Sequence, residues 1–264
     1  MKNIVLLVFF CTQAYSQDYF RGKNLHCSTN NPEAKRLFDG GIEVLHLNDR
    51  LDKKYLAMNA EIFGRAILQD TTFCDGYFFA GYTLNLLGQF REAYAFHKMA
   101  DKLSPKVDLL YKQNLAAICL KVGLIDEARE NYNQMVQFFP ESPEGYYGVA
   151  ITSPMVGDYS NGIINGKKAA DLYSSSGFEK DQVTYITGIL LTLNKEYAEG
   201  LSTLKEVPKR LRKDDHFNIF YSLSLLQVSI STNDPEMKKE SVKYYKKIKD
   251  KANITEEVKS LFIF

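Results

Sequence analysis

Small and apolar residues recur along the chain at fixed offsets, and this pattern predicts a series of helix pairs. Gly88, Ala93 and Pro105 are separated by five and twelve residues, and the same offsets separate Gly123 from its alanine and proline. A small residue stands seven positions before each glycine, as Gly81 does. The glycine is expected to end a first helix, the small residues to let two helices approach, and the proline to end the pair.

The same phase continues beyond these two best-matching units. Gly157 stands at the turn position of the next unit, and Gly188 at the small-residue position of the one after it, whose turn glycine is replaced by Lys195. In these two units Gly162 and Gly200 replace the second-helix alanine. The predicted units are 32–73, 74–108, 109–142, 143–176, 181–212 and 214–250, followed by a terminal helix over 255–264. Each helix pair has an apolar face that it cannot bury alone, so the units are expected to stack.

These periods predict an all-α fold, a solenoid of stacked antiparallel helix pairs. A β-rich fold would need apolar and polar residues to alternate over short runs, and the chain shows no consistent stretch of this kind. An irregular helical bundle is the alternative all-α interpretation. A bundle needs no common phase between its segments, so the recurrent offsets argue against it.

The pattern resembles the tetratricopeptide repeat (TPR) family. In the first well-matched unit, the residues that carry the resemblance are Tyr77, Gly81, Leu84, Gly88, Phe90, Ala93, Ala100 and Pro105. In the next unit they are Leu115, Ala116, Gly123, Ile125, Ala128, Tyr132 and Pro140. The resemblance covers about residues 32 to 250 and implies a right-handed TPR-like superhelix.

The resemblance also implies a concave groove, lined by the first helices, that holds a peptide or protein segment. The residues mapped to this groove are Phe78, Tyr82, Asn85, Gln113, Ala117, Tyr147, Ile151, Tyr185 and Ile189. Their rings can hold a ligand at low entropic cost. The groove lacks the paired Lys/Arg and Asn set with which some family members clamp a C-terminal carboxylate, so that mode is not predicted.

The first residues resemble an export signal. A lysine precedes the apolar run 4–11, which is too short for a membrane span, and small residues two apart end at Ser16. We therefore predict a signal peptide over 1–16 and an N-terminal extension over 17–31. A buried N-terminal helix and a lipoprotein acylated at Cys11 are the alternatives, the second disfavoured by the bulky residues before that cysteine. The predicted location is periplasmic or extracellular, in a bacterial envelope.

Charge and composition narrow the functional classes. The 264 residues carry 33 Lys and Arg against 32 Asp and Glu, which argues against a general nucleic-acid binder. No later segment has the apolar length of a membrane span. The lysine-rich stretch 238–251 is interpreted as a solvated outer face, with contact to an anionic surface as the alternative.

Three cysteines remain after the predicted cleavage, and an oxidising compartment allows two of them to pair. Cys27 precedes the first helix and Cys74 opens the best-matching unit. A disulfide between them is predicted if the N-terminal extension folds back over the first helix pair; two separate thiols are the alternative. Cys119 is expected to be a small core residue.

The sequence shows no convincing catalytic constellation. The four histidines are scattered, and none has a second histidine or a cysteine at helical spacing to share a metal. His97 stands where a large packing residue is expected. No phosphate-binding loop and no nucleophile elbow is present. No metal site, no cofactor and no enzymatic activity are therefore predicted.

The leading hypothesis is a non-enzymatic exported scaffold or adaptor that binds a protein or peptide partner in an aromatic and apolar groove. Two alternatives remain open. One is a solenoid that binds a small ligand such as a glycan or lipid, and the other is an accessory subunit of an envelope enzyme. A pocket closed at both ends would favour the small ligand, whereas an open trough would favour a peptide.

Overall fold

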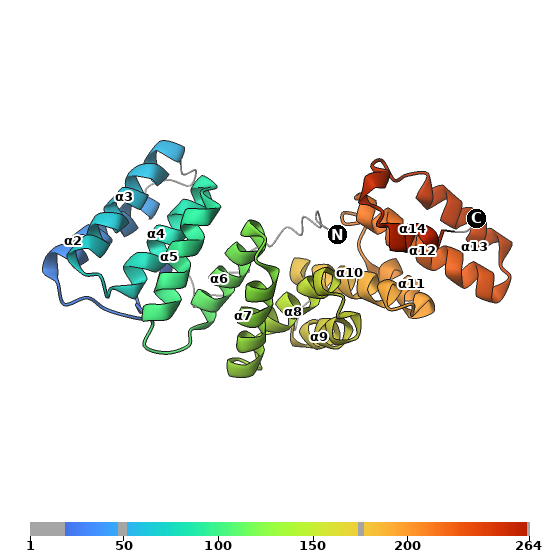
Figure 1. Cartoon of the computed structure of the whole chain (residues 1–264), viewed down its shortest axis with the longest axis horizontal. Helices are drawn as coiled ribbons and strands as arrows, with labels where there is room; N and C mark the ends of the chain where they lie inside the picture. Colours follow the sequence, from blue (N-terminus) through green and yellow to red (C-terminus); the bar gives the residue numbers. More distant parts are fainter. Residues whose placement is uncertain (1–18, 47–51, 174–176, 263–264) are drawn as a thin grey trace. The chain divides into compact units, whose positions relative to one another are not determined.

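The computed structural model describes residues 19–46, 52–173 and 177–262, and these residues form helices in consecutive packed pairs (Figure 1). The pairs are α2 (Pro32–His46) with α3 (Lys53–Gln69), α4 (Cys74–Leu87) with α5 (Phe90–Leu103), α6 (Leu109–Val122) with α7 (Ile125–Phe138), α8 (Pro143–Val156) with α9 (Tyr159–Leu172), α10 (Phe178–Leu193) with α11 (Tyr197–Glu206), and α12 (Asp215–Thr232) with α13 (Pro235–Tyr245). A 3₁₀ turn (Lys251–Asn253) and the short helix α14 (Glu256–Ser260) follow.

The described residues contain no β-strand, so the predicted all-α class is confirmed. The predicted signal peptide over 1–16 lies outside the described residues. None of the described helices combines the length and the apolar character that a membrane span requires. At the other end, α14 stops at Ser260, and Leu261 and Phe262 lie beyond it.

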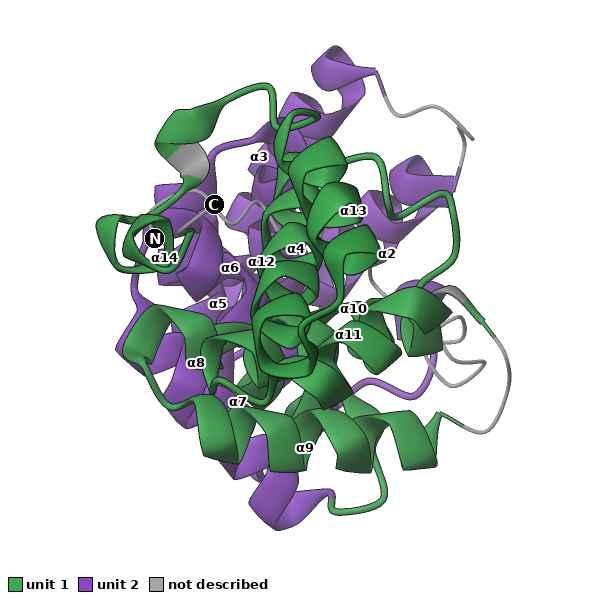
Figure 2. Ribbon diagram, turned by 90° about the vertical axis from the view of Figure 1, so that its right-hand side faces the viewer, with its two compact units in different colours: residues 1–7, 140–264 green, residues 8–139 purple. Residues whose placement is uncertain are grey.

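The helices belong to two compact units (Figure 2). Helices α2 to α7 form the N-terminal unit, and helices α8 to α14 form the C-terminal unit. Within each unit a helix packs against the helices before and after it, which buries the apolar face that a single pair would leave exposed.

The turns inside the pairs follow the predicted glycine pattern. Gly88, Gly123 and Gly157 have φ angles of 80°, 82° and 74°, in the left-handed region that glycine adopts without steric cost. Lys195 and Asn233 stand at the corresponding turns of the next two pairs, with φ angles of 66° and 54°. The turn geometry is therefore kept where the glycine is absent.

Small residues allow the two helices of each pair to cross closely. A Cβ added at Gly81 would lie 3.1 Å from the His97 ring, and one added at Gly162 would lie 2.5 Å from the Cβ of Ser153. The facing serine therefore explains why glycine replaces the usual alanine at position 162.

The core of the N-terminal unit is aromatic. Five phenylalanines and two tyrosines in it are almost fully buried: Tyr19, Phe38, Phe63, Phe73, Phe78, Phe79 and Tyr111. Tyr19 precedes the first helix pair, so a segment outside the repeats contributes to this core.

Candidate functional site

The segment of residues 19–31, which we name the arm, packs against the first helix of the second pair. The Tyr19 ring lies 5.3 Å from the Phe78 ring and 5.2 Å from the Phe79 ring, centroid to centroid. The neighbouring Phe20 ring lies 4.8 Å from the Tyr82 ring. The arm therefore covers the face of α4 on which the sequence predicts a groove.

A buried carboxylate on α4 accepts three hydrogen bonds, two from the arm and one from α6. Asp75 accepts from the Tyr19 hydroxyl at 2.5 Å, the Tyr111 hydroxyl at 2.6 Å and the Cys27 backbone N–H at 2.7 Å. Burial raises the pKa of the Asp75 carboxyl, and these three donors oppose the rise. Burial also raises the pKa of both tyrosines, which keeps them protonated as donors.

A disulfide joins the arm to the start of α4. Cys27 and Cys74 are bonded, with their Cα atoms 5.9 Å apart, and this is the pair predicted from the sequence. Cys27 is half-buried and Cys74 is fully buried. The Asp75 carboxylate lies within 4.8 Å of both sulfurs. Metals bind thiolates, however, and disulfide sulfurs are not thiolates, so this cluster is not a metal site in the oxidised protein. Cys119 is free and buried.

Further polar contacts fix both ends of the arm. His26 Nδ1 lies 3.1 Å from the Asp108 carboxylate, which also caps the start of α6. The Phe20 carbonyl oxygen lies 2.8 Å from His46 Nε2 on α2, and the Thr29 hydroxyl donates to Asp70 at 2.5 Å. The arm is therefore connected to α2, α4 and α6 as well as to the turn after α3.

The five predicted groove residues of the N-terminal unit have different surroundings. Phe78 and Ala117 are fully buried, Phe78 beneath the arm, so neither offers surface to a partner. Tyr82 is half-buried against the arm. Asn85 and Gln113 are also half-buried, and Asn85 accepts a 2.7 Å hydrogen bond from Lys121 Nζ.

The four predicted groove residues of the C-terminal unit are mostly buried as well. Ile151 and Ile189 are in the core, because first helices also pack against one another. Tyr185 is buried, and its hydroxyl donates to Asp214 at 2.6 Å, at the cap of α12. Tyr147 is half-buried, and burial raises its pKa. It is the mapped residue of this unit with the most accessible surface.

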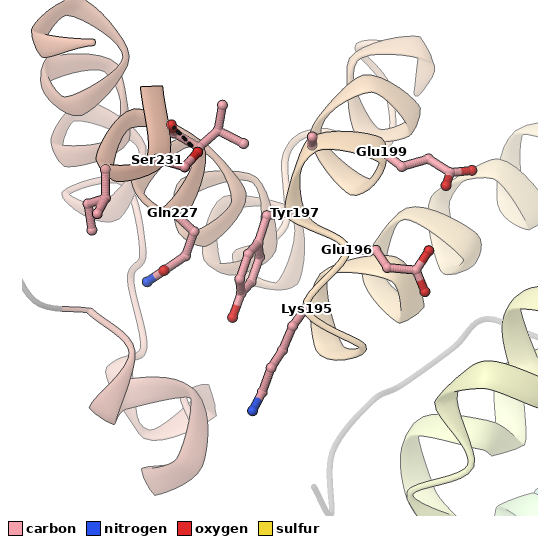
Figure 3. Close-up of a pocket in the computed structure, with 9 residues that line it drawn as sticks. Lys195, Glu196, Tyr197, Glu199, Gln227 and Ser231 are labelled. Atoms are coloured by element: carbon pink, nitrogen blue, oxygen red, sulfur yellow. Dashed lines mark hydrogen bonds between the residues drawn. The ribbon is translucent and has the colours of Figure 1, made fainter. Parts of the chain in front are cut away.

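An open pocket of about 590 Å³ lies between the α10–α11 turn and α12 (Figure 3). Lys195, Tyr197 and Gln227 extend in the same general direction into it, whereas Glu196 and Glu199 point away. The repeat pattern assigns none of these residues to a site. The one available signal was the lysine at a turn position that holds glycine in three other pairs.

Gln227 also binds the end of the described chain. Its Nε2 donates to the Leu261 backbone carbonyl at 2.8 Å, so α12 holds an irregular segment by a backbone hydrogen bond. The neighbouring Phe262 ring lies 4.8 Å from the Tyr245 ring.

Comparison with known proteins supports the fold. No family model and no curated protein matches the chain. A tetratricopeptide repeat protein from Parabacteroides merdae is similar with a TM-score of 0.60 and 13% identity, over 87% of this chain and 98% of that one. MamA from Desulfovibrio magneticus RS-1 is similar with a TM-score of 0.59 and 15% identity, over 68% of this chain and 95% of that one. The chain has the tetratricopeptide repeat fold.

A third similar structure is also a tetratricopeptide repeat protein. YrrB, described as a TPR protein with an unusual peptide-binding site, is similar with a TM-score of 0.55 and 14% identity, over 72% of this chain and 91% of that one. The TPR-like architecture expected from the glycine, alanine and proline offsets is thereby confirmed.

His97 has a packing role in this fold. It is 1% exposed, and its ring lies 5.3 Å from the Phe78 ring. Neither ring nitrogen has a hydrogen-bond partner within the described part of the chain, and burial lowers its pKa to about 3. The imidazole is therefore neutral at physiological pH and serves as a core side chain.

Proposed function

We propose that this chain is a non-enzymatic scaffold that binds a protein or peptide segment on the first helices of its repeats. One observation carries the proposal: in each unit a first helix already holds an irregular segment of the chain by a backbone hydrogen bond. In the N-terminal unit Asp75 on α4 accepts from the Cys27 N–H, and in the C-terminal unit Gln227 on α12 donates to the Leu261 carbonyl.

These contacts are of the kind that recognise extended peptides. Backbone hydrogen bonds supply affinity regardless of sequence, and aromatic side chains add selectivity at low entropic cost. YrrB, a protein of the same fold, is described as having an unusual peptide-binding site. Together these observations support a protein or peptide partner.

We further propose that the protein works in an oxidising compartment outside the cytoplasm. The Cys27–Cys74 disulfide supports this, because disulfides persist in exported proteins and are rare in reducing compartments. The signal peptide predicted over 1–16 is consistent with the same location.

Photo-crosslinking in the native host tests the scaffold function. A photoreactive amino acid would replace half-buried Tyr147 on α8 or half-buried Tyr197 beside the pocket, with exposed Lys246 as the control position. We expect one discrete protein adduct from the two aromatic positions and none from the control. Absence of a protein adduct at both positions would contradict the proposal and would favour a small ligand, such as a glycan or lipid, in the pocket beside Tyr197.

A further inference from the structure

The arm makes the contacts that a bound peptide would make. It lies outside every helix pair, yet it places two adjacent rings on α4, those of Tyr19 and Phe20. It adds a backbone N–H to the Asp75 carboxylate. Beneath it lie Phe78 and Tyr82, two of the residues that the repeat pattern maps to the groove.

The chemistry of this face defines the segment that fits it. A tyrosine is favoured at the first position, because its ring packs between Phe78 and Phe79 while its hydroxyl reaches a buried carboxylate. A second aromatic residue follows at once, against Tyr82. Seven residues after the tyrosine, a histidine or a basic side chain would meet the Asp108 carboxylate, as His26 does.

The disulfide is placed to control this occupancy. It connects the arm to the first residue of α4, directly beside Asp75. Cys27 is half-buried whereas Cys74 is fully buried, so Cys27 is the more accessible end of the bond. Because the bond holds the arm at a high effective concentration over α4, an outside segment competes poorly while it is intact.

We propose that the α4 face around Asp75 is a peptide site occupied by the chain's own arm, and that reduction of the Cys27–Cys74 disulfide opens it to an outside segment with adjacent tyrosine and aromatic residues. The proposal rests on the proposed function, since it takes a first-helix face as a peptide site, and it adds the ligand chemistry and the control.

The reduction requires a dithiol as co-reactant. One thiolate of the dithiol attacks the Cys27 sulfur, the bond between the two protein sulfurs breaks, and Cys74 takes up a proton as it leaves. The second thiol then attacks the mixed disulfide and releases Cys27 as a thiol. The dithiol ends as a disulfide, its two protons end on the two cysteines, and two electrons pass to the protein. The Tyr111 hydroxyl lies 3.4 Å from the Cys74 sulfur.

A tryptophan reporter tests the release of the arm. The chain contains no tryptophan, so Phe20→Trp places a single indole on the arm, and Phe96→Trp places one on α5 in the same core, as the matched control. Acrylamide quenching is measured on the full chain before and after treatment with dithiothreitol. We expect reduction to raise quenching several-fold in Phe20→Trp and to leave Phe96→Trp unchanged. No change in Phe20→Trp, or an equal rise in both, would overturn the gating.

A labelled peptide tests the site itself. The probe is a fluorescent peptide of residues 17–31 carrying Cys27→Ser, and its target is the full chain carrying Tyr19→Ala and Phe20→Ala, whose own arm competes weakly. By fluorescence anisotropy, we expect affinity about tenfold or more higher for the reduced than for the oxidised target, because the tethered arm no longer blocks α4. A control peptide with the two alanines should not bind the reduced target.

Equal affinity in the two redox states, or equal binding of the control peptide, would overturn the proposal. Circular dichroism of the reduced target verifies that it remains helical. Neither experiment needs an external partner or the C-terminal unit. Their outcome is therefore distinguishable from that of crosslinking at Tyr147 and Tyr197.

Discussion

Lys195 adopts a left-handed backbone conformation, with φ at 66°, where three other pairs have glycine. This conformation costs a side-chain-bearing residue about 1–2 kcal/mol, whereas glycine adopts it freely but loses more entropy on folding. We predict that Lys195→Gly raises the free energy of unfolding by about 0.5–1 kcal/mol, the difference between these effects. Urea denaturation followed by circular dichroism measures it.

Asn233→Gly is the matched control for this substitution. Its φ is 54°, and asparagine tolerates the left-handed region better than lysine does. The gain at Asn233 should therefore be smaller than the gain at Lys195. An equal or larger gain at Asn233 would show that backbone strain does not distinguish the two turns.

The buried imidazole of His97 makes stability depend on pH. Its pKa is about 3 in the folded protein against 6.5 for an ordinary histidine, so protonation favours the unfolded chain. The contribution of neutral His97 to the free energy of unfolding is fully present above about pH 6.5. It is lost as the pH falls toward 3, by about 1.4 kcal/mol per pH unit. We predict that His97→Leu removes about 2–3 kcal/mol of the loss between pH 7 and pH 4.5. Urea denaturation at both pH values measures this, and an unchanged pH slope would exclude His97 as the cause.

At the scale of single helices, the crossing of α4 and α5 depends on Gly81. Its hypothetical Cβ lies 3.1 Å from the His97 ring and 3.2 Å from the Ala93 carbonyl oxygen. We predict that Gly81→Leu lowers the free energy of unfolding by about 3 kcal/mol or more, because overpacking forces the two helices apart. A circular dichroism melt measures the change.

Gly64→Leu on α3 is the control for this substitution. No atom lies within 4 Å of a Cβ added at Gly64, and leucine has the higher helix propensity. This variant should melt at or above the parent temperature. Equal destabilisation by both substitutions would mean that loss of glycine alone, and not the crossing, is responsible.

The helices could be predicted from the sequence because their ends depend on local chemistry. A residue with positive φ follows each first helix from α4 onward, and the glycines at 88, 123 and 157 mark three of these turns directly. The arm follows no such rule, because Tyr19 meets Asp75 across 56 residues of chain. Asp75 could have been singled out from the sequence, because it is an acidic residue beside a cysteine at the start of a mainly apolar and aromatic helix.

The groove mapping was less informative for a related reason. A repeat pattern identifies which residues point away from a helix's own partner, but not whether another segment covers them. Phe78 is mapped correctly to a first helix and is nevertheless buried, because Tyr19 lies on it. Tyr185 is likewise buried, because it lies against Phe217 and Asp214 at the start of α12.

At the scale of the whole molecule, the two units should respond differently to reduction. All four cysteines precede residue 140, so the C-terminal unit contains none and serves as an internal control. The 47-residue separation between Cys27 and Cys74 corresponds to about 4 kcal/mol of loop-closure entropy. We predict that reduction lowers the stability of the N-terminal unit by about this amount and leaves that of the C-terminal unit unchanged.

Native-state hydrogen exchange with mass spectrometry resolves the two units by their peptides. The expected result is faster exchange in α2 to α5 after reduction, with constant exchange in α10 to α13. A uniform acceleration over the whole chain would contradict the prediction, because repeat units share free energy chiefly with their immediate neighbours.

The disulfide also makes the first helix pair a closed covalent ring, since Cys27 precedes α2 and Cys74 begins α4. A protease that cuts one peptide bond anywhere between those two cysteines opens the ring but separates no fragment. The nicked protein keeps its mass apart from one added water and migrates as one species until it meets a reductant. Chains cut in this part therefore stay in one piece in an oxidising compartment. The two fragments separate only when the disulfide is reduced.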